Sequence, residues 1–345
     1  MTPDSLDIQR AARLLEQGKL VAFPTETVYG LGADATNPDA VAAIFTAKGR
    51  PSNHPLIVHV ARDADLYRWA SHIPAEANLL INAFWPGPLT IILPRSDKVP
   101  AAVAGGQNSI GLRCPAHPVA LALLAEFRQG QGGIAAPSAN RFGHVSPTTA
   151  QHVIDEFGQS ANSPIACVLD GGQSEVGIES TIVDLTRCDS VGPVVLRPGQ
   201  MSVAQLAKSL GYMPTVPSAP DVAAPRVSGS LEAHYAPTTP LVLIDSADLL
   251  SLCQRLDAAH IRYALMHYST IANDQHHAIA IQQIAGEAAG YAHRMYASMR
   301  WLDNQKAALM VVERPPMRDE WLGINDRLRR AAFESSDIVE RLLKR

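Results

Sequence analysis

The sequence lacks the motifs that would assign it to a common nucleotide-binding or covalent-catalysis class. Its 345 residues contain no GxGxxG fingerprint, no GxxxxGK[ST] phosphate loop and no internal repeat. We find no Ser-His-Asp or Cys-His arrangement. The four cysteines are scattered without CxxC spacing, which argues against a zinc site or a disulfide framework and predicts free thiols in a reducing compartment.

Long apolar runs and a charge excess of one sign are also missing. No apolar run approaches the roughly 18 residues that a membrane-spanning helix needs. The first ten residues are polar and carry both charge signs, unlike a secretory signal peptide. The formal net charge of −4 gives no general attraction to nucleic acid. We therefore expect a cytoplasmic protein with no membrane partner.

The length and the pattern of elements predict two α/β domains joined by a linker. Residues 1–211 alternate near seven apolar strands with helices, and we expect a twisted sheet of mixed pairing. Residues 212–240 form a proline-rich linker that includes Pro214, Pro217, Pro220, Pro225, Pro237 and Pro240. Residues 241–345 resume the β-α alternation and predict a small Rossmann-like domain.

The most informative stretch runs from residue 20 to residue 60. Leu20–Phe23 predicts a buried strand, Gly30 and Gly32 a turn, and Leu56–Val60 a second strand. Between them, Asn37 and Pro38 predict the start of a helix that ends near Gly49. Lys48 and Arg50 would then lie exposed at the helix end. A strand, turn, helix and strand in this order place such cations where a parallel sheet usually binds its ligand.

Other polar residues begin or end predicted strands: His59, Arg113, Ser138, Asn140, Ser180 and Arg197. Taken singly, each has an ordinary structural explanation, such as a solvated charge, a turn residue or a buried hydrogen-bonded histidine. Together they supply several cations and several small donors without an excess of carboxylates. Such a set suits a polyanion such as ATP, because arginine and lysine complement phosphate oxygens.

One family has motifs that resemble the sequence around Lys48, Arg50, Arg113, Ser180 and Arg197, and an SxN pair that resembles Ser138 and Asn140. The motifs are PTETVYGLG at 24–32, KGRPSNHPL at 48–56, IGLRCP at 110–115, GIESTIVD at 177–184, LRPG at 196–199 and HYAP at 234–237. They resemble the YrdC-type threonylcarbamoyl-AMP synthases in their long, two-domain form. The run before HYAP departs from the family pattern, because residues 227–233 lack its proline and lysine.

The resemblance implies an enzyme that joins L-threonine, bicarbonate or CO2, and ATP. The product would be L-threonylcarbamoyl-AMP, with release of pyrophosphate and with Mg2+ bound to the triphosphate. A downstream partner complex would pass the threonylcarbamoyl group to the adenosine next to the anticodon of tRNA. The resemblance also implies a YrdC-like fold for the N-terminal domain.

The resemblance further implies a division of roles among the site residues. Lys48 and Arg50 would serve catalysis. The nucleotide would be held by Lys48, Arg50, His54, Ser138, Asn140, Arg197 and Tyr235. Threonine would be held by Thr27, His59, Arg113 and Ser180, with Arg113 paired to its carboxylate. No metal site made of protein side chains is implied. Tyr235 would close over the site as part of a linker lid.

Two other readings stay open at this point. The YrdC-like fold is also associated with double-stranded RNA binding, although the acidic balance argues against it. A carbamoyl-adenylate-forming enzyme, like the hydrogenase maturation factor with a related domain, is the second. That protein carries CxxC zinc motifs, which this sequence lacks.

Overall fold

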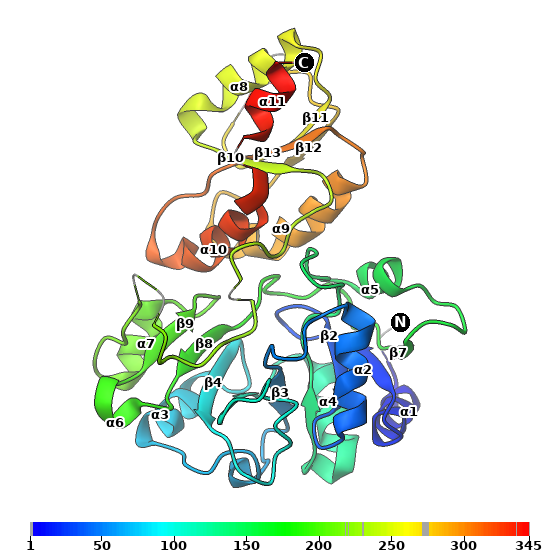
Figure 1. The fold of residues 1–345 in the computed structure, drawn as a ribbon, viewed down its shortest axis with the longest axis vertical. Helices are drawn as coiled ribbons and strands as arrows, with labels where there is room; N and C mark the ends of the chain where they lie inside the picture. Colours follow the sequence, from blue (N-terminus) through cyan, green and yellow to red (C-terminus); the bar gives the residue numbers. More distant parts are fainter. Residues whose placement is uncertain are drawn as a thin grey trace. The chain divides into compact units, whose positions relative to one another are not determined.

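The protein is described here by a computed structural model that covers residues 3–344, except 218, 220, 230, 271–275 and 336, and without the side chain of residue 334. The chain forms two compact units. The first comprises residues 1–142 and 146–230, and the second comprises residues 143–145 and 231–345. Each unit has its own sheet (Figure 1).

The first unit is built on a nine-stranded sheet with the order β7-β1-β2-β6-β3-β5-β4-β8-β9. Three neighbouring pairs are parallel, β1 with β7, β3 with β5 and β4 with β8, and the other five are antiparallel. The expected mixed sheet is therefore confirmed. Its strands are β1 Leu20–Phe23, β2 Gly30–Asp34, β3 Ile57–Val60, β4 Leu89–Pro94, β5 Ser109–Arg113, β6 Gly133–Ala135, β7 Ile165–Val168, β8 Thr181–Asp184 and β9 Val194–Arg197.

The segment around Gly30 and Gly32 is a strand, β2, and the predicted turn there is wrong. Strand β2 pairs antiparallel with β1, so β1 and β3 are not neighbours and the expected parallel unit does not form. A Cβ atom at Gly32 would lie 2.8 Å from both Phe23 and Ile134. Glycine is present in this strand because large side chains on the two neighbouring strands fill the space above it.

Helices cover both faces of this sheet. Val21 and Phe23 join the core formed with α1 and α4, whereas Leu20 and Ala22 join the larger core formed with α2, α3 and α7. Alternate residues of one strand thus supply opposite layers. The helices are α1 Ser5–Glu16, α2 Pro38–Lys48, α3 Ala75–Phe84, α4 Pro118–Glu126, α5 Ala150–Phe157, α6 Cys188–Val191 and α7 Val203–Leu210, with 3-10 turns Leu66–Arg68 and Phe127–Gly130.

Helix α2 has the predicted ends. The side chain of Asn37 accepts hydrogen bonds from the backbone N–H groups of Asp39 and Ala40, and Pro38 is the first helical residue. Gly49 ends the helix with φ of 63°, in the left-handed region that glycine adopts without strain. This sharp end sets the direction in which Lys48 and Arg50 leave the helix.

The second unit has a four-stranded, fully parallel sheet with the order β10-β13-β11-β12. Its strands are β10 Leu241–Ile244, β11 Tyr263–His267, β12 Ala280–Gln283 and β13 Leu309–Glu313. Its helices are α8 Ser246–Ala258, α9 Ala288–Asp303, α10 Leu322–Ala331 and α11 Ile338–Leu343, with 3-10 turns Asp319–Trp321 and Phe333–Ser335. Helices α8 and α11 lie on one side of the sheet, and α9 and α10 lie on the other (Figure 1). The predicted small Rossmann-like domain is present.

The linker predicted for residues 212–240 contains no helix or strand among its described residues. Pro220 and Ser230 lie outside the described residues. The two units divide this segment, because residues up to 230 belong to the first and residues from 231 belong to the second. Among the described residues, no helix is both long enough and apolar enough to span a bilayer.

Candidate active site

Lys48 is buried, and its predicted exposure is wrong. Only 3% of its surface is accessible, and its ammonium group donates hydrogen bonds to the backbone carbonyls of Ser138 and Asn140. Burial, followed by the charge of Arg50, lowers the pKa of Lys48 well below its usual value. The helix end turns the lysine into the protein because the loop that follows β6 supplies two carbonyl acceptors there.

Arg50 is also buried, with 6% of its surface accessible, so its predicted exposure is wrong as well. Its guanidinium donates to the carbonyl of Pro55 at 3.0 Å and lies 6.0 Å from the ring centre of Phe142. The imidazole of His54 meets the same ring edge-on, with centroids 5.4 Å apart. Burial and then the charges of Arg50 and Arg226 lower the pKa of His54. Arg50 and His54 therefore form one group around Phe142.

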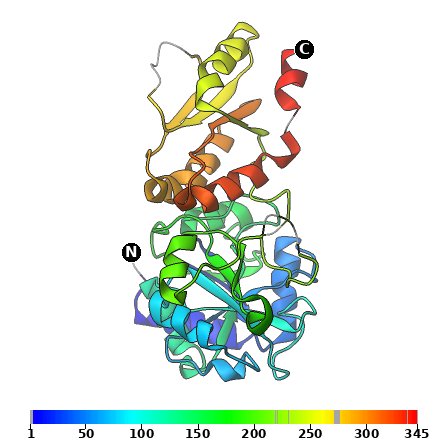
Figure 2. The same cartoon turned by 90° about the vertical axis from the view of Figure 1, so that its left-hand side faces the viewer.

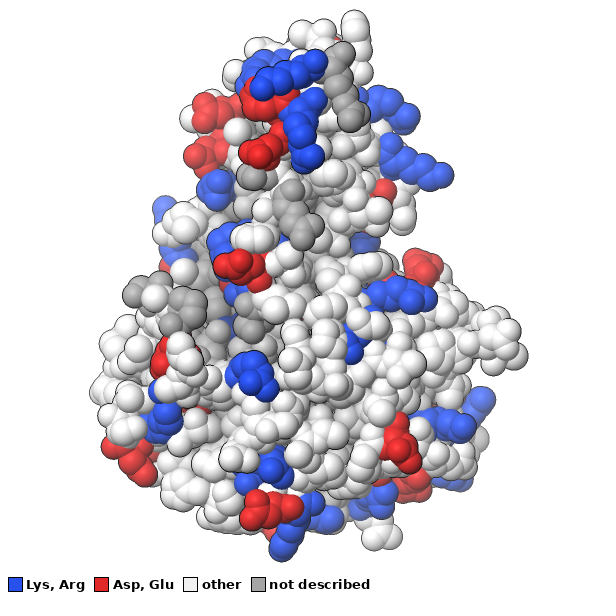
Figure 3. All heavy atoms as spheres, in the orientation of Figure 1, with Lys and Arg blue, Asp and Glu red and all other residues white. Residues whose placement is uncertain are grey.

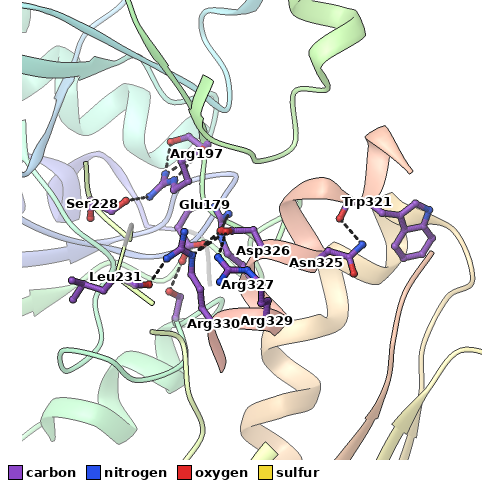
Figure 4. A network of polar contacts seen from close by, with 12 residues as sticks. Glu179, Arg197, Ser228, Leu231, Trp321, Asn325, Asp326, Arg327, Arg329 and Arg330 are labelled. Carbon is purple, nitrogen blue, oxygen red and sulfur yellow. Dashed lines mark hydrogen bonds and ion pairs between the residues drawn. The ribbon is translucent and has the colours of Figure 1, made fainter. Parts of the chain in front are cut away.

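Ser228 of the linker lies between two predicted nucleotide-binding arginines. Its hydroxyl is 3.3 Å and 3.4 Å from the two terminal nitrogens of Arg50, and its carbonyl accepts a hydrogen bond from Arg197 at 2.9 Å (Figure 4). Arg197 also donates to the carbonyl and hydroxyl of Ser180. The Ser180 hydroxyl is 2.7 Å from that of Thr90.

The linker residues just before Ser228 are fixed to the first unit. The backbone N–H of Arg226 donates to the side chain of Gln107 at 2.7 Å, and its guanidinium donates to the carbonyl of Gly105 at 3.0 Å. Val227 is buried against Ile92 and Ile182. This part of the linker is thus packed against the sheet of the first unit and does not act as a free tether.

Arg113 is buried and bonded to residues of the PTETVYGLG motif. One terminal nitrogen is 2.7 Å from a carboxylate oxygen of Glu26, and the other donates to the hydroxyl of Thr27 at 2.9 Å. Its Nε donates to the carbonyl of Gly87 at 3.2 Å. Glu26 also accepts from the backbone N–H of Ala116. The guanidinium is therefore held rigidly, in a position set by three separate segments.

His59 pairs with Arg113 across strands β3 and β5. It is buried, its ring packs edge-on against Phe23, and its Nδ1 has no hydrogen-bond partner in the part of the chain that the structure describes. Burial, followed by the charge of Arg113, lowers the pKa of His59 to about 3. The imidazole is therefore neutral at physiological pH and offers a polar atom inside the protein.

Neighbouring strands bring most of the predicted residues of the first unit together. In sheet order, Ser138 and Asn140 follow β6, His59 lies on β3, Arg113 on β5, Ser180 just before β8 and Arg197 on β9. Because β6 runs antiparallel to β3, Ser138 follows β6 near the start of β3, whereas His59 lies near the end of β3. One edge of the sheet thus carries His59, Arg113, Ser180 and Arg197, whereas the residues after β6 leave the sheet at the opposite end of β3.

Tyr235 belongs to the second unit, where it is buried at 1% accessible surface. Its φ of 62° lies in the left-handed region, which is uncommon for a residue with a side chain. Its ring stacks on Tyr296 with centroids 5.9 Å apart. Its role as part of a lid remains a prediction.

Three residues of the arrangement had no assigned role in the sequence analysis. Glu26 lies inside the PTETVYGLG motif. Its carboxylate stands out among predicted site residues that are cations and small donors, and this was the signal that could have indicated an ion pair. Ser228 lies in the run that departs from the family pattern. Gln107 follows the Gly105-Gly106 pair in a loop, and nothing in its spacing predicts a contact with residue 226.

Comparisons with known proteins cover nearly the whole chain. A family model described as "Telomere recombination" matches residues 13–199, and one described as "Threonylcarbamoyl-AMP synthase, C-terminal domain" matches residues 201–333. The threonylcarbamoyl-AMP synthase of Bacillus subtilis is 37% identical over 335 residues, which is 94% of this chain and 92% of the relative. That of Pyrococcus abyssi is 43% identical over 240 residues, covering 69% of this chain and 68% of the relative.

The chain belongs to the threonylcarbamoyl-AMP synthase family. A solved structure described as P. abyssi Sua5 complexed with L-threonine matches 96% of both chains, with a TM-score of 0.86 and 33% identity. Another, described as H234A/Y235A P. abyssi Sua5, matches the same share with a TM-score of 0.85. The match extends over both units, so the long, two-domain form of the family is confirmed.

In a threonylcarbamoyl-AMP synthase with this geometry, replacing Lys48 should affect both stability and turnover. Lys48→Met leaves the carbonyls of Ser138 and Asn140 without their donor and should lower the free energy of unfolding by about 1–3 kcal/mol. If Lys48 binds phosphate as the resemblance implies, its loss should also reduce turnover roughly 10²–10³-fold. Urea denaturation and pyrophosphate release measure the two effects.

Lys208→Met is the matched control, because Lys208 also occupies the last turn of a helix but is exposed. It should change the free energy of unfolding by no more than about 0.5 kcal/mol. If the two variants behaved alike in both measurements, the assigned role of Lys48 would be wrong.

His59 should make the first unit of this synthase sensitive to acid. Between its ordinary pKa of about 6.5 and its folded pKa of about 3, the unfolded chain binds a proton that the folded chain does not. Stability is therefore retained above about pH 6.5 and lost as the pH falls toward 3. His59→Gln should reduce this slope by up to about 1.4 kcal/mol per pH unit. Urea denaturation at pH 7, 6, 5 and 4 tests this, and equal slopes for both proteins would contradict it.

Proposed function

We propose that this protein synthesises L-threonylcarbamoyl-AMP from L-threonine, bicarbonate or CO2, and ATP, and releases pyrophosphate. It is a nucleotidyltransferase-type enzyme. The observation that carries the proposal is the match over nearly the full length of both units to threonylcarbamoyl-AMP synthases, one of them solved with L-threonine. Membership of this family implies use of L-threonine and ATP.

The positions of the charges support this chemistry. The amine of threonine would combine with CO2 to give a carbamate, and a carbamate oxygen would attack the α-phosphorus of ATP. The bond from that phosphorus to the pyrophosphate oxygen would break. The substrate thus supplies the nucleophile, so the protein needs mainly to position the groups and neutralise charge. Three buried cations, Lys48, Arg50 and Arg197, are suited to the phosphates.

Threonine would bind at the group formed by Thr27, His59, Arg113 and Ser180. Arg113 would pair with the threonine carboxylate, because Glu26 and Thr27 already hold its guanidinium in place. Ser138 and Asn140, whose carbonyls hold Lys48, would lie next to the nucleotide together with His54. These assignments extend the sequence prediction and remain part of the proposal.

Mg2+ would enter with the triphosphate. Among the described residues, no three His, Cys, Asp or Glu side chains gather in a way that could hold a metal ion. The groups near Arg197 include Arg50 and the hydroxyls of Ser180 and Ser228, which can donate to phosphate oxygens. The metal would be held mainly by phosphate oxygens and water, and would neutralise charge on the pyrophosphate that leaves.

The proposal includes a downstream complex that transfers the threonylcarbamoyl group to the adenosine beside the anticodon of tRNA. It also places the protein in the cytoplasm, and its four free cysteines suit a reducing compartment. The RNA-binding alternative is less favoured. On the face shown in Figure 3, basic side chains alternate with acidic ones and form no continuous stripe.

The test is nucleotide consumption with each substrate omitted in turn, with the product identified by mass spectrometry. Pyrophosphate release should require both L-threonine and bicarbonate. Threonine should be preferred over serine by roughly 10–200-fold, which is the selectivity that one methyl group provides.

Arg113→Ala should weaken threonine binding far more than ATP binding. Activity that depended on carbamoyl phosphate would favour the carbamoyl-adenylate enzyme. RNA binding that falls steeply with salt, without turnover, would favour the RNA-binding module.

The linker is proposed to act as a lid that keeps water from the mixed anhydride. Truncation near residue 210 should leave the nine-stranded sheet folded, but the protein should bind ATP more weakly and lose the reactive intermediate, because the linker can no longer close over the site and keep water out. Tyr235→Ala should cause part of the same loss of activity. Limited proteolysis within residues 212–240 should be fast without ligands and slow with ATP and threonine. Equal cleavage rates would mean that the segment is a passive spacer.

A further inference from the structure

The second unit buries an arginine against the tyrosine of the HYAP motif. Arg327, on α10, has no accessible surface, and the carbon of its guanidinium lies 5.4 Å from the ring centre of Tyr235. A buried charge needs compensation, and a face of an aromatic ring provides part of it. Asp326 supplies a carboxylate 3.0 Å from the same guanidinium. Arg327 thus contacts a linker residue that lies far from it in sequence.

Tyr235 is held on several sides within this unit. Besides Arg327, its ring contacts those of His234, with centroids 4.1 Å apart, and Tyr296. The next residue, Ala236, donates its backbone N–H to the carbonyl of Gly143 at 2.8 Å. A left-handed backbone at a tyrosine persists only where surrounding contacts favour it. The second unit supplies these contacts.

Helix α10 also fixes the backbone on the N-terminal side of Tyr235. Figure 4 shows Asp326 among the guanidinium groups of Arg327, Arg329 and Arg330. Arg330 donates to the carbonyl of Leu231, and its own carbonyl accepts from the backbone N–H of His234. The run from 231 to 235 is therefore bound at both ends by the same helix.

Helix α9 completes the contact from the other side. It carries Tyr296, which stacks on Tyr235, and Arg300, which donates to the carbonyl of Val145. Helices α9 and α10 lie side by side in both views of the ribbon (Figures 1 and 2). The segment 143–145 follows Asn140 by only three residues, so this unit binds two pieces of chain that continue directly into parts of the proposed site.

We propose that Arg327 is a positioning residue for the reaction, acting through its ring contact with Tyr235, and that the C-terminal domain serves to hold the HYAP segment with Tyr235 in its left-handed backbone conformation. This rests on the proposed function of the enzyme. Arg327 touches no substrate in this scheme. Its loss would let Tyr235 leave the conformation in which it closes the lid.

A double-mutant cycle tests the proposal. Arg327→Met should lower kcat/KM for threonine at least tenfold in the otherwise unchanged protein. In the Tyr235→Ala background the same change should cost less than twofold, because the group through which Arg327 acts is gone. Arg327→Lys, which keeps the charge but not the planar group, should lie between. Arg255→Met, which breaks an exposed ion pair with Glu340 in the same unit, should leave kcat/KM unchanged.

If Arg327→Met lowered kcat/KM by the same factor with and without the Tyr235 side chain, the proposal would be overturned, because a general loss of stability does not depend on Tyr235.

A second measurement needs no activity: 3-fluorotyrosine placed at position 235 reports its surroundings by fluorine NMR. Its resonance should move in Arg327→Met and stay unchanged in Arg255→Met. An unmoved resonance in Arg327→Met would overturn the contact itself. If Arg327→Met did not fold, Arg327→Lys would decide through the same resonance. Lack of threonine-dependent turnover in the unchanged protein would refute the proposed function, while the fluorine measurement would still decide the role of Arg327.

Discussion

Buried positive charge is the constraint on which this structure depends. The first unit removes Lys48, Arg50, Arg113 and Arg197 almost entirely from water, and each such charge is costly unless groups of the protein replace the lost solvent. Backbone carbonyls do so for Lys48, a carboxylate for Arg113, and linker and strand oxygens for Arg197. Carbonyl and hydroxyl dipoles supply several of these contacts, and the carboxylates of Glu156 and Glu179 also act on Lys48. The cations are thus already held in place, as stabilisation of phosphoryl transfer requires.

The sheet makes this burial possible by letting segments approach closely. Gly32 allows Phe23 and Ile134 to pack over its backbone, and Gly199 brings the turn after β9 against the start of β8, where an added Cβ would lie 2.4 Å from the nitrogen of Thr181. The second approach places Arg197 over the carbonyl of Ser180. Glycine in these motifs therefore acts through packing, and at Gly199 its effect on the site is to bring Arg197 against Ser180.

Local signals in the sequence were enough for the elements and motifs but not for their partners. The caps of α2 depend on Asn37, Pro38 and Gly49, which are adjacent to the helix they define, so its ends were predictable. Strand β2 was not predicted, because two glycines close together favour a turn when only the local sequence is considered. Glycine occurs at position 32 of this strand because Phe23 and Ile134 of the neighbouring strands pack over it. The burial of Lys48 was missed for the same reason, since its acceptors lie 90 and 92 residues away. Side-chain roles read from a family pattern locate a site, but its charge balance depends on distant contacts such as that of Glu26 with Arg113.

Each unit binds its own part of the linker, and this division gives the C-terminal domain a structural role. Arg197 binds the carbonyl of Ser228 on the first unit, and Arg330 binds the carbonyl of Leu231 on the second, only three positions further along the chain. Each part of the linker is thus ordered by its own unit, so it has fewer conformations to lose on closing over a ligand than a free tether has. Binding of ATP would compete with Ser228 for Arg50 and Arg197, because phosphate oxygens are stronger acceptors than a hydroxyl or a carbonyl. If ATP binds as proposed, nucleotide entry and the position of Ser228 would be linked through the same two guanidinium groups.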